Sequence, residues 1–181
     1  LLIWAEARNV LLAPESVRAI SEVGSSIEQA PDILSVQKLR NMDLQFLEPL
    51  NVIDADFFSL QKGENGENQL KGMINNDWKG PQITSYVDEF FSFSDTAAFI
   101  ENLDLVISVD TSTAHIAGAL GKPVWMLNRF DTCWRWFIDR SDSPWYPTFT
   151  IYRQDASRRW EPVIKHVLND LTDRFGIKQS T

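Results

Sequence analysis

The 181-residue chain carries 17 basic and 25 acidic residues, and its net charge of −8 argues against a surface built for general attraction to nucleic acid or anionic lipid. The length suits one well-buried domain, and the single cysteine, Cys133, excludes an intrachain disulfide. Since no apolar stretch approaches roughly 20 residues and no Cys/His cluster has metal-site spacing, we expect a cytoplasmic protein without a membrane span or a metal.

The first 40 residues carry weak and mixed signals. Residues 1–4 fit either an edge strand or the end of a preceding element, and residues 13–23 look helical. Turn-forming Gly, Ser and Pro residues punctuate the rest of this segment. We therefore expect a loop-rich or helical lead-in at residues 1–40, followed by one domain at residues 41–181.

Short apolar runs rich in β-branched or aromatic residues alternate with helix-like segments from about residue 55 onward. We predict strands at residues 56–60, 105–109, 124–127 and 149–152, and a weaker strand at residues 83–87. The run at 105–109 has almost no polar alternation, so we expect it to be buried on both faces near the centre of a parallel sheet. The pattern predicts an α/β fold, with a Rossmann-like parallel sheet and flanking helices.

Three helices fit between and after these strands. Ser94 and Asp95 indicate the capped start of the first helix, because their side chains can accept from free amides of the first turn. Residues 113–120 indicate a short second helix, which is rich in small residues and closed by Gly121. The third helix, at residues 160–175, has apolar positions at helical spacing.

A polar segment follows the buried strand at the point where the second helix begins. It consists of four consecutive residues: Asp110, Thr111, Ser112 and Thr113. Amide groups and the helix dipole converge there on an anion, and small hydroxylated residues let a phosphate come close. His115, one turn further, adds a donor that is charged only when protonated. The alternative, which we weight equally, is an ordinary capped helix in which Asp110 and Thr111 serve only the turn.

A second candidate segment places Gln61 and Lys62 just past the strand predicted at residues 56–60. If the strands are parallel neighbours, Lys62 projects over the same edge as Thr111 and supplies a positive charge to a diphosphate. The alternative is an exposed loop lysine without a ligand.

Trp134 and Arg135 belong to an aromatic stretch that follows the strand predicted at residues 124–127. Flat aromatic faces and a guanidinium group can stack on a base or a sugar ring. Alternatively, the tryptophans of this stretch fill a core under a long loop, which is the interpretation we favour for Trp145. Cys133 has no neighbouring base in the sequence, so we assign it no nucleophilic role.

Several motifs of other enzyme classes are absent from the sequence. These are the GxGxxG fingerprint, the GxxxxGK[ST] loop, the GxSxG elbow and the HExxH pair. Their absence argues against a dehydrogenase, a P-loop nucleotidase, an α/β-hydrolase and a zinc protease.

The segments Asp95-Thr96-Ala97-Ala98 and Leu103 to Trp125 resemble the C-terminal half of glycosyltransferase family 9 proteins. In particular, they resemble the bacterial group that carries tetratricopeptide repeats ahead of a heptosyltransferase-like domain. Shorter matches to that group lie at residues 58–63, 134–136, 143–147 and 153–154. The similarity extends over roughly residues 40–170 and keeps the order of these segments.

This resemblance implies one half of a GT-B fold, the C-terminal domain that binds a nucleotide-diphospho-sugar, in an inverting transferase that uses neither a metal nor a cofactor. It implies that Asp110 faces the donor sugar and that Asp95, Thr96, Trp134 and Arg135 lie near the nucleoside. It places the following residues around the phosphates: Thr111, Ser112, Thr113, His115, Gln61 and Lys62. Hydroxyl groups, amides and a cation would stabilise the leaving diphosphate.

Two departures from the family pattern narrow this interpretation. Ser112-Thr113 stands where the heptosyltransferase pattern has Gly-Pro, which argues against ADP-heptose as the donor. The acceptor domain is also missing, apart from a remnant at residues 2–5, and in this family it supplies the general base. We therefore expect donor binding here, with the acceptor or repeat domain of a parent protein as partner. The alternative function is a non-catalytic GT-B-like module that binds a nucleotide or a protein.

Overall fold

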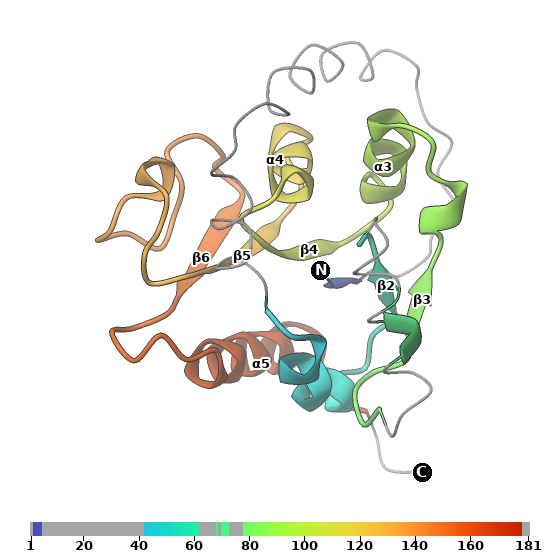
Figure 1. Ribbon diagram of the computed structural model, residues 1–181, viewed down its shortest axis with the longest axis horizontal. Coiled ribbons are helices and arrows are strands. Elements are labelled where there is room, and N and C mark those ends of the chain that lie inside the picture. Colours follow the sequence, from blue (N-terminus) through green and yellow to red (C-terminus); the bar gives the residue numbers. More distant parts are fainter. Residues whose placement is uncertain (1, 5–41, 62–67, 69, 73–77, 179–181) are drawn as a thin grey trace.

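A computed structural model describes residues 2–4, 42–61, 68, 70–72 and 78–178 of the chain. These residues form one six-stranded sheet with helices on both faces (Figure 1). The strand order across the sheet is β3-β2-β1-β4-β5-β6. In the described part of the chain, no helix has the length and apolar character needed to cross a membrane.

The sheet is parallel in five of its six strands. Its strands, in chain order, are β1 (Leu2–Trp4), β2 (Phe57–Ser59), β3 (Ile83–Ser85), β4 (Leu105–Val109), β5 (Val124–Asn128) and β6 (Phe149–Arg153). β2 pairs with β3 in parallel, as do β4 with β5 and β5 with β6. β1 is antiparallel to both β2 and β4, so those two strands point the same way. The predicted α/β fold is confirmed, with a single reversed strand inside the parallel sheet.

The position of β1 corrects one sequence expectation. Leu2 pairs with Ser59 of β2 on one side and with Ile107 of β4 on the other, so this strand lies in the middle of the sheet. An edge strand at residues 1–4 was therefore wrong. The helix predicted at residues 13–23 lies outside the described residues.

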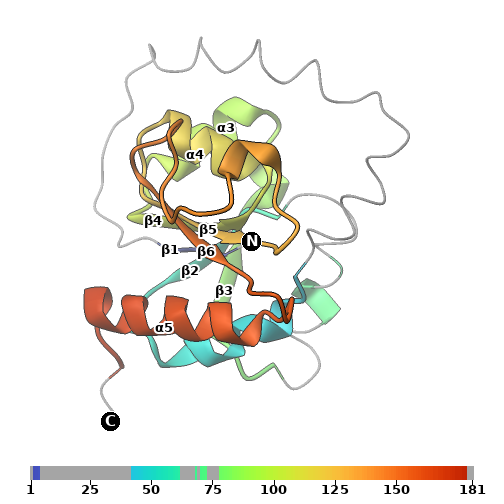
Figure 2. The same ribbon diagram turned by 90° about the vertical axis from the view of Figure 1, so that its left-hand side faces the viewer.

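Helices cover both faces of the sheet. The α-helices are α3 (Phe93–Ile100), α4 (Ser112–Ala119) and α5 (Glu161–Phe175), and the 3-10 helices are η3 (Leu44–Val52), η4 (Val87–Glu89) and η5 (Trp134–Trp136). α3 and α4 lie side by side on one face, whereas α5 and the cyan η3 cover the other (Figures 1 and 2). The strand predicted at residues 83–87 stops at Ser85, because the chain turns into η4 from Val87.

The start of α3 differs from the predicted cap. Ser92, rather than Ser94, is the N-cap residue, and its side chain accepts a hydrogen bond from the amide of Asp95. The Asp95 carboxylate accepts in return from the amide of Ser92 at 2.8 Å. This reciprocal capping box satisfies two amides at once, which explains why the helix begins at Phe93.

Alternate residues of the central strands contribute their side chains to two separate hydrophobic cores, one on each face of the sheet. Val106 and Met126 pack on the side of α3 and α4, whereas Leu105, Ile107 and Trp125 pack on the side of α5. β4 is buried along nearly its whole length, as its apolar run predicts. Each large apolar side chain removed from water in this way contributes about 1.5–3 kcal/mol.

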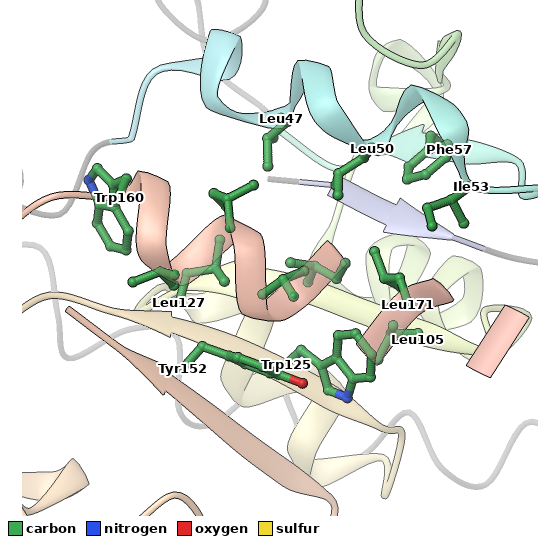
Figure 3. Close-up of a cluster of buried hydrophobic side chains, with 14 of the residues drawn as sticks. Leu47, Leu50, Ile53, Phe57, Leu105, Trp125, Leu127, Tyr152, Trp160 and Leu171 are labelled. Atoms are coloured by element: carbon green, nitrogen blue, oxygen red, sulfur yellow. The ribbon is translucent and has the colours of Figure 1, made fainter. Parts of the chain in front are cut away.

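The core under α5 consists of long aliphatic and aromatic side chains. α5 begins with a proline in its first turn and ends at Gly176, whose φ of 82° suits glycine. Leu47 and Leu50 of η3 approach α5 from one side, and Trp125 and Tyr152 of the sheet approach it from the other (Figure 3). This layer holds α5 and η3 on the sheet.

Candidate functional site

The junction between β4 and α4 lies at the carboxyl edge of the parallel strands, where ligands bind in open α/β sheets. Asp110 follows β4 and is 7% exposed, and Thr111 is the N-cap residue of α4. Ser112 and Thr113 form the first turn of the helix. The structure therefore brings together the four consecutive polar residues that the sequence places after this strand.

The Thr111 side chain does not cap α4. Its hydroxyl lies 3.1 Å from that of Ser108, which donates its own proton to the carbonyl of Val109 at 2.7 Å. Thr111 must then donate to Ser108, because a serine hydroxyl has only one proton. No acidic residue lies in the first turn of α4. The side chain of the N-cap residue thus makes no capping hydrogen bond to the first-turn amides of this helix.

His115 lies one turn inside α4 and contacts groups on three sides. Its Nε2 is 3.8 Å from Oδ1 of Asp110, and its Nδ1 is 3.0 Å from the Tyr146 hydroxyl. Its ring stacks on the fully buried Trp136 at a centroid distance of 5.3 Å. The side chain keeps 32% of its surface exposed. His115 is therefore held in place and still partly exposed to solvent.

Tyr146 occupies a space that a glycine of α4 leaves open. A Cβ atom at Gly118 would lie 2.7 Å from Cγ of Tyr146 and 2.6 Å from Cε2 of Phe149. The Tyr146 ring stacks on that of Phe149 at 4.9 Å, and burial raises the pKa of the Tyr146 hydroxyl, with the charge of Arg135 opposing the shift. From the sequence we assign Tyr146 no individual role, although it stands in the aromatic stretch after β5.

Gln61 follows β2 at the same edge of the sheet. Ser59 of β2 and Ile107 of β4 are level, since both pair with Leu2, and about 10 Å separates two strands across a third. Gln61 is exposed, and its backbone N–H donates to the Ser59 hydroxyl at 3.2 Å. Lys62, the predicted diphosphate cation, lies outside the described residues.

Asp95 and Thr96 both serve the start of α3. The Asp95 carboxylate accepts from the amides of Phe91 and Ser92, each at 2.8 Å. The Thr96 hydroxyl donates to the carbonyl of Ser92 at 3.4 Å. α3 lies beside α4 on the same face of the sheet (Figure 2). The polar groups of both side chains thus have partners just before the helix. Their contact with a nucleoside stays a prediction.

The loop after β5 presents Trp134 to solvent, with 72% of its surface exposed. The guanidinium of Arg135 lies over its ring at 5.9 Å, and the Arg135 Nε is buried without a partner among the described residues. Trp145 is 53% exposed, and its indole donates to the Arg135 carbonyl at 2.9 Å. Our expectation that Trp145 fills the core was wrong, since Trp136 takes that position.

An open groove of about 1110 Å³ runs along this loop. Its lining combines aromatic, aliphatic, acidic and basic side chains: Phe130, Asp131, Thr132, Trp134, Phe137, Ile138, Asp139, Arg140 and Asp142. Arg153 of β6 fixes the loop, because its side chain donates to the carbonyls of Arg140, at 2.9 Å, and Trp136. Burial lowers the pKa of Arg153, and the charge of Asp139 opposes the shift. The loop that lines the groove is thus held in place by hydrogen bonds from β6.

Comparison with known proteins finds a family match in the part of the chain that contains the junction of β4 and α4. Residues 91–129, which span α3, β4, α4 and β5, match the family model described as glycosyltransferase family 9 (heptosyltransferase). Protein FlbA of Caulobacter vibrioides is 31% identical over 87 residues, which is 48% of this chain and 14% of FlbA. The chain therefore corresponds to a small part of that relative. No solved structure matches the chain.

Proposed function

Because residues 91–129 match the family model of glycosyltransferase family 9, we propose that the chain binds the nucleotide-diphospho-sugar donor of an inverting, metal-independent transferase. The domain proposed for this task spans residues 41–181 and forms one half of a GT-B fold. The other half, on a parent protein of the tetratricopeptide-repeat-associated bacterial group, supplies the acceptor site and the general base. The small share of FlbA that the chain matches is consistent with such a larger parent protein.

The observation that carries this proposal is the uncapped start of α4. Its first-turn amides point toward the ligand edge of the sheet, and the Thr111 hydroxyl is turned to Ser108 instead of to those amides. A diphosphate oxygen can accept from these amides in place of the Thr111 side chain, and the helix dipole favours its negative charge. The hydroxyl groups of Ser112 and Thr113 add donors to the same oxygen atoms.

The remaining polar residues are assigned around this phosphate position. Asp110 accepts from hydroxyl groups of the donor sugar, and His115 donates to the diphosphate. Gln61 and Lys62 approach the diphosphate from β2, which ends at the same edge of the sheet. Charge that develops on the leaving diphosphate is then stabilised by fixed donors, which need no rearrangement during the reaction.

The nucleoside is assigned to the residues that flank the junction. Trp134 offers an exposed aromatic face, and the buried Nε of Arg135 beside it has no hydrogen-bond partner in the described part of the chain. A base stacked on Trp134 would gain the energy of an aromatic contact, about 0.5–1.5 kcal/mol beyond its buried area. Asp95 and Thr96 approach the ribose from the start of α3.

Calorimetric titration of the 181-residue chain with UDP, ADP and GDP tests the proposal. We expect at least one to bind, and Thr113→Val to weaken its binding by about 1–3 kcal/mol, since that change removes one donor to a charged oxygen and keeps the side-chain shape. Thr172→Val is the matched control, because the Thr172 hydroxyl bonds within α5 on the opposite face. Absence of binding to all three at millimolar concentration contradicts the proposal.

A further inference from the structure

The hydrogen bond between His115 and Tyr146 joins two residues 31 positions apart in the chain. Tyr146 reaches Nδ1 of the imidazole at 3.0 Å, while the opposite nitrogen, Nε2, lies 3.8 Å from Oδ1 of Asp110. A neutral imidazole carries one proton and therefore has one donor and one acceptor nitrogen. The two neighbours decide which nitrogen holds the proton.

The carboxylate of Asp110 and the phenol of Tyr146 favour the same arrangement. With the proton on Nδ1, the lone pair of Nε2 would face the negative charge of Asp110, which is repulsive. With the proton on Nε2, that N–H faces the carboxylate and Nδ1 accepts from the Tyr146 hydroxyl. A carboxylate only accepts, whereas a phenol can donate, so this arrangement gives each group a suitable partner.

We propose that Tyr146 is a positioning residue that holds His115 as the Nε2–H tautomer, with this proton on the side of Asp110, next to the start of α4 where the diphosphate is proposed to bind. The proposal rests on the proposed donor binding for its ligand, but not for the tautomer itself. Tyr146 thereby becomes part of the donor site without touching the donor.

The surroundings of the pair support a fixed geometry. His115 stacks on Trp136 with the two rings inclined by 28°, and Tyr146 stacks on Phe149 with an inclination of 26°. Gly118 leaves room for the Tyr146 ring, because a Cβ there would lie within 3 Å of it. Burial raises the pKa of Tyr146, so the phenol keeps the proton that it donates. Both rings are thus held, and the hydroxyl remains a donor at neutral pH.

The tautomer can be observed directly by nitrogen NMR of histidine-labelled protein. His166 is exposed on α5 and gives an internal reference, assigned by His166→Gln. We expect the signals of His115 to show a protonated Nε2 and an unprotonated Nδ1 in the wild type at pH 8. In Tyr146→Phe, the Nε2–H tautomer should lose its dominance. A wild-type Nδ1–H tautomer, or unchanged signals in Tyr146→Phe, overturns the proposal.

Tyr152→Phe is the matched control for Tyr146→Phe. It also removes one partly buried hydroxyl and its hydrogen bond, but on the α5 face, where Tyr152 donates to Asp170 at 2.6 Å. Its His115 signals should equal those of the wild type. A change of the same size in both variants would indicate general loosening of the sheet and would overturn the proposal.

Affinity for the diphosphate gives the second measurement. Tyr146→Phe should weaken binding of whichever of UDP, ADP and GDP binds by about 2- to 12-fold, as the loss of one hydrogen bond predicts, and Tyr152→Phe should leave it unchanged. Equal affinity of Tyr146→Phe and wild type overturns the positioning role. If the wild type binds none of the three, donor binding fails, and the NMR signals alone decide the tautomer.

Discussion

Each face of the sheet holds a tyrosine whose hydroxyl makes a hydrogen bond with a titratable side chain, but the two tyrosines have different surroundings. Tyr152 donates to Asp170 of α5, and burial, followed by the hydrogen bond and charge of Asp170, raises its pKa well above the ordinary value. Tyr146 bonds to His115, which remains partly exposed beside the start of α4. The same chemical group thus fastens a helix on one face and, as we propose, orients His115 beside the diphosphate position on the other.

The two faces of the sheet also differ in the size of the side chains that their helices contribute to the core. α5 contributes long aliphatic side chains to its core, whereas α4 contributes small residues, among them Ala114, Ala117 and Gly118. Small residues let a helix lie close to the sheet and leave room for the stacked rings beside His115. We therefore expect changes on the α5 face to affect stability alone, and changes on the α4 face to affect stability and ligand binding together.

The largest effect is expected from truncation on the α5 face. Leu171 is fully buried under α5, so Leu171→Ala should lower the free energy of unfolding by about 2–5 kcal/mol, because it removes a core side chain and leaves a cavity. Urea denaturation measures the loss. At temperatures where the variant stays folded, its affinity for a nucleoside diphosphate should equal that of the wild type. A weaker affinity would break the distinction between the faces.

A smaller loss of stability, with a loss of affinity, is expected from Gly118→Ala on the α4 face. The added methyl group would overlap Tyr146 and Phe149, and such overpacking costs about 1–3 kcal/mol, against the roughly 1 kcal/mol that alanine gains in a helix. Urea denaturation and diphosphate titration measure the two effects. Gly72→Ala is the control, because a Cβ at Gly72 meets no atom within 4 Å. Unchanged binding in Gly118→Ala would contradict the importance of the Tyr146 position.

The smallest effect is expected from Tyr152→Phe, which should lower the free energy of unfolding by about 1 kcal/mol through loss of its hydrogen bond. The folded-state pKa of Tyr152 lies above its unfolded value, so its contribution is complete below about pH 10 and is lost as the pH rises further. The difference between variant and wild type should therefore shrink in urea denaturation above that pH. A difference in the free energy of unfolding that grows with pH would contradict burial and the Asp170 hydrogen bond as the cause of the raised pKa.

Local patterns allowed much of the fold to be predicted. The apolar runs of β4 and β5 and the helical spacing of α5 identified these elements within one residue at each end. The place of β1 could not be predicted, because a strand of three residues carries no pattern that selects its neighbours. η3 contains Pro49 and lacks the 3.6-residue period of an α-helix, so it also left no signal.

In the candidate site, the contacts between residues close in sequence could be predicted, whereas those between distant segments could not. Asp110, Thr111 and His115 lie on one strand-to-helix junction, so their proximity follows from the sequence order. The contact of His115 with Tyr146 joins separate segments of the chain, and no local pattern indicates it. The exposure of Trp145 depends likewise on how the loop after β5 folds back along β6. Tertiary packing decides such contacts.

The central claim is that the diphosphate binds at the start of α4. Amide NMR during titration with the nucleoside diphosphate that binds tests this claim most directly. We predict that the amide signals of Ser112, Thr113 and Ala114 shift in proportion to the bound fraction, because the proposed site places their N–H groups against the phosphate oxygens. The amides of α5 should remain in place. Shifts confined to the groove around Trp134, with the three α4 amides unchanged, would contradict a phosphate site at this helix.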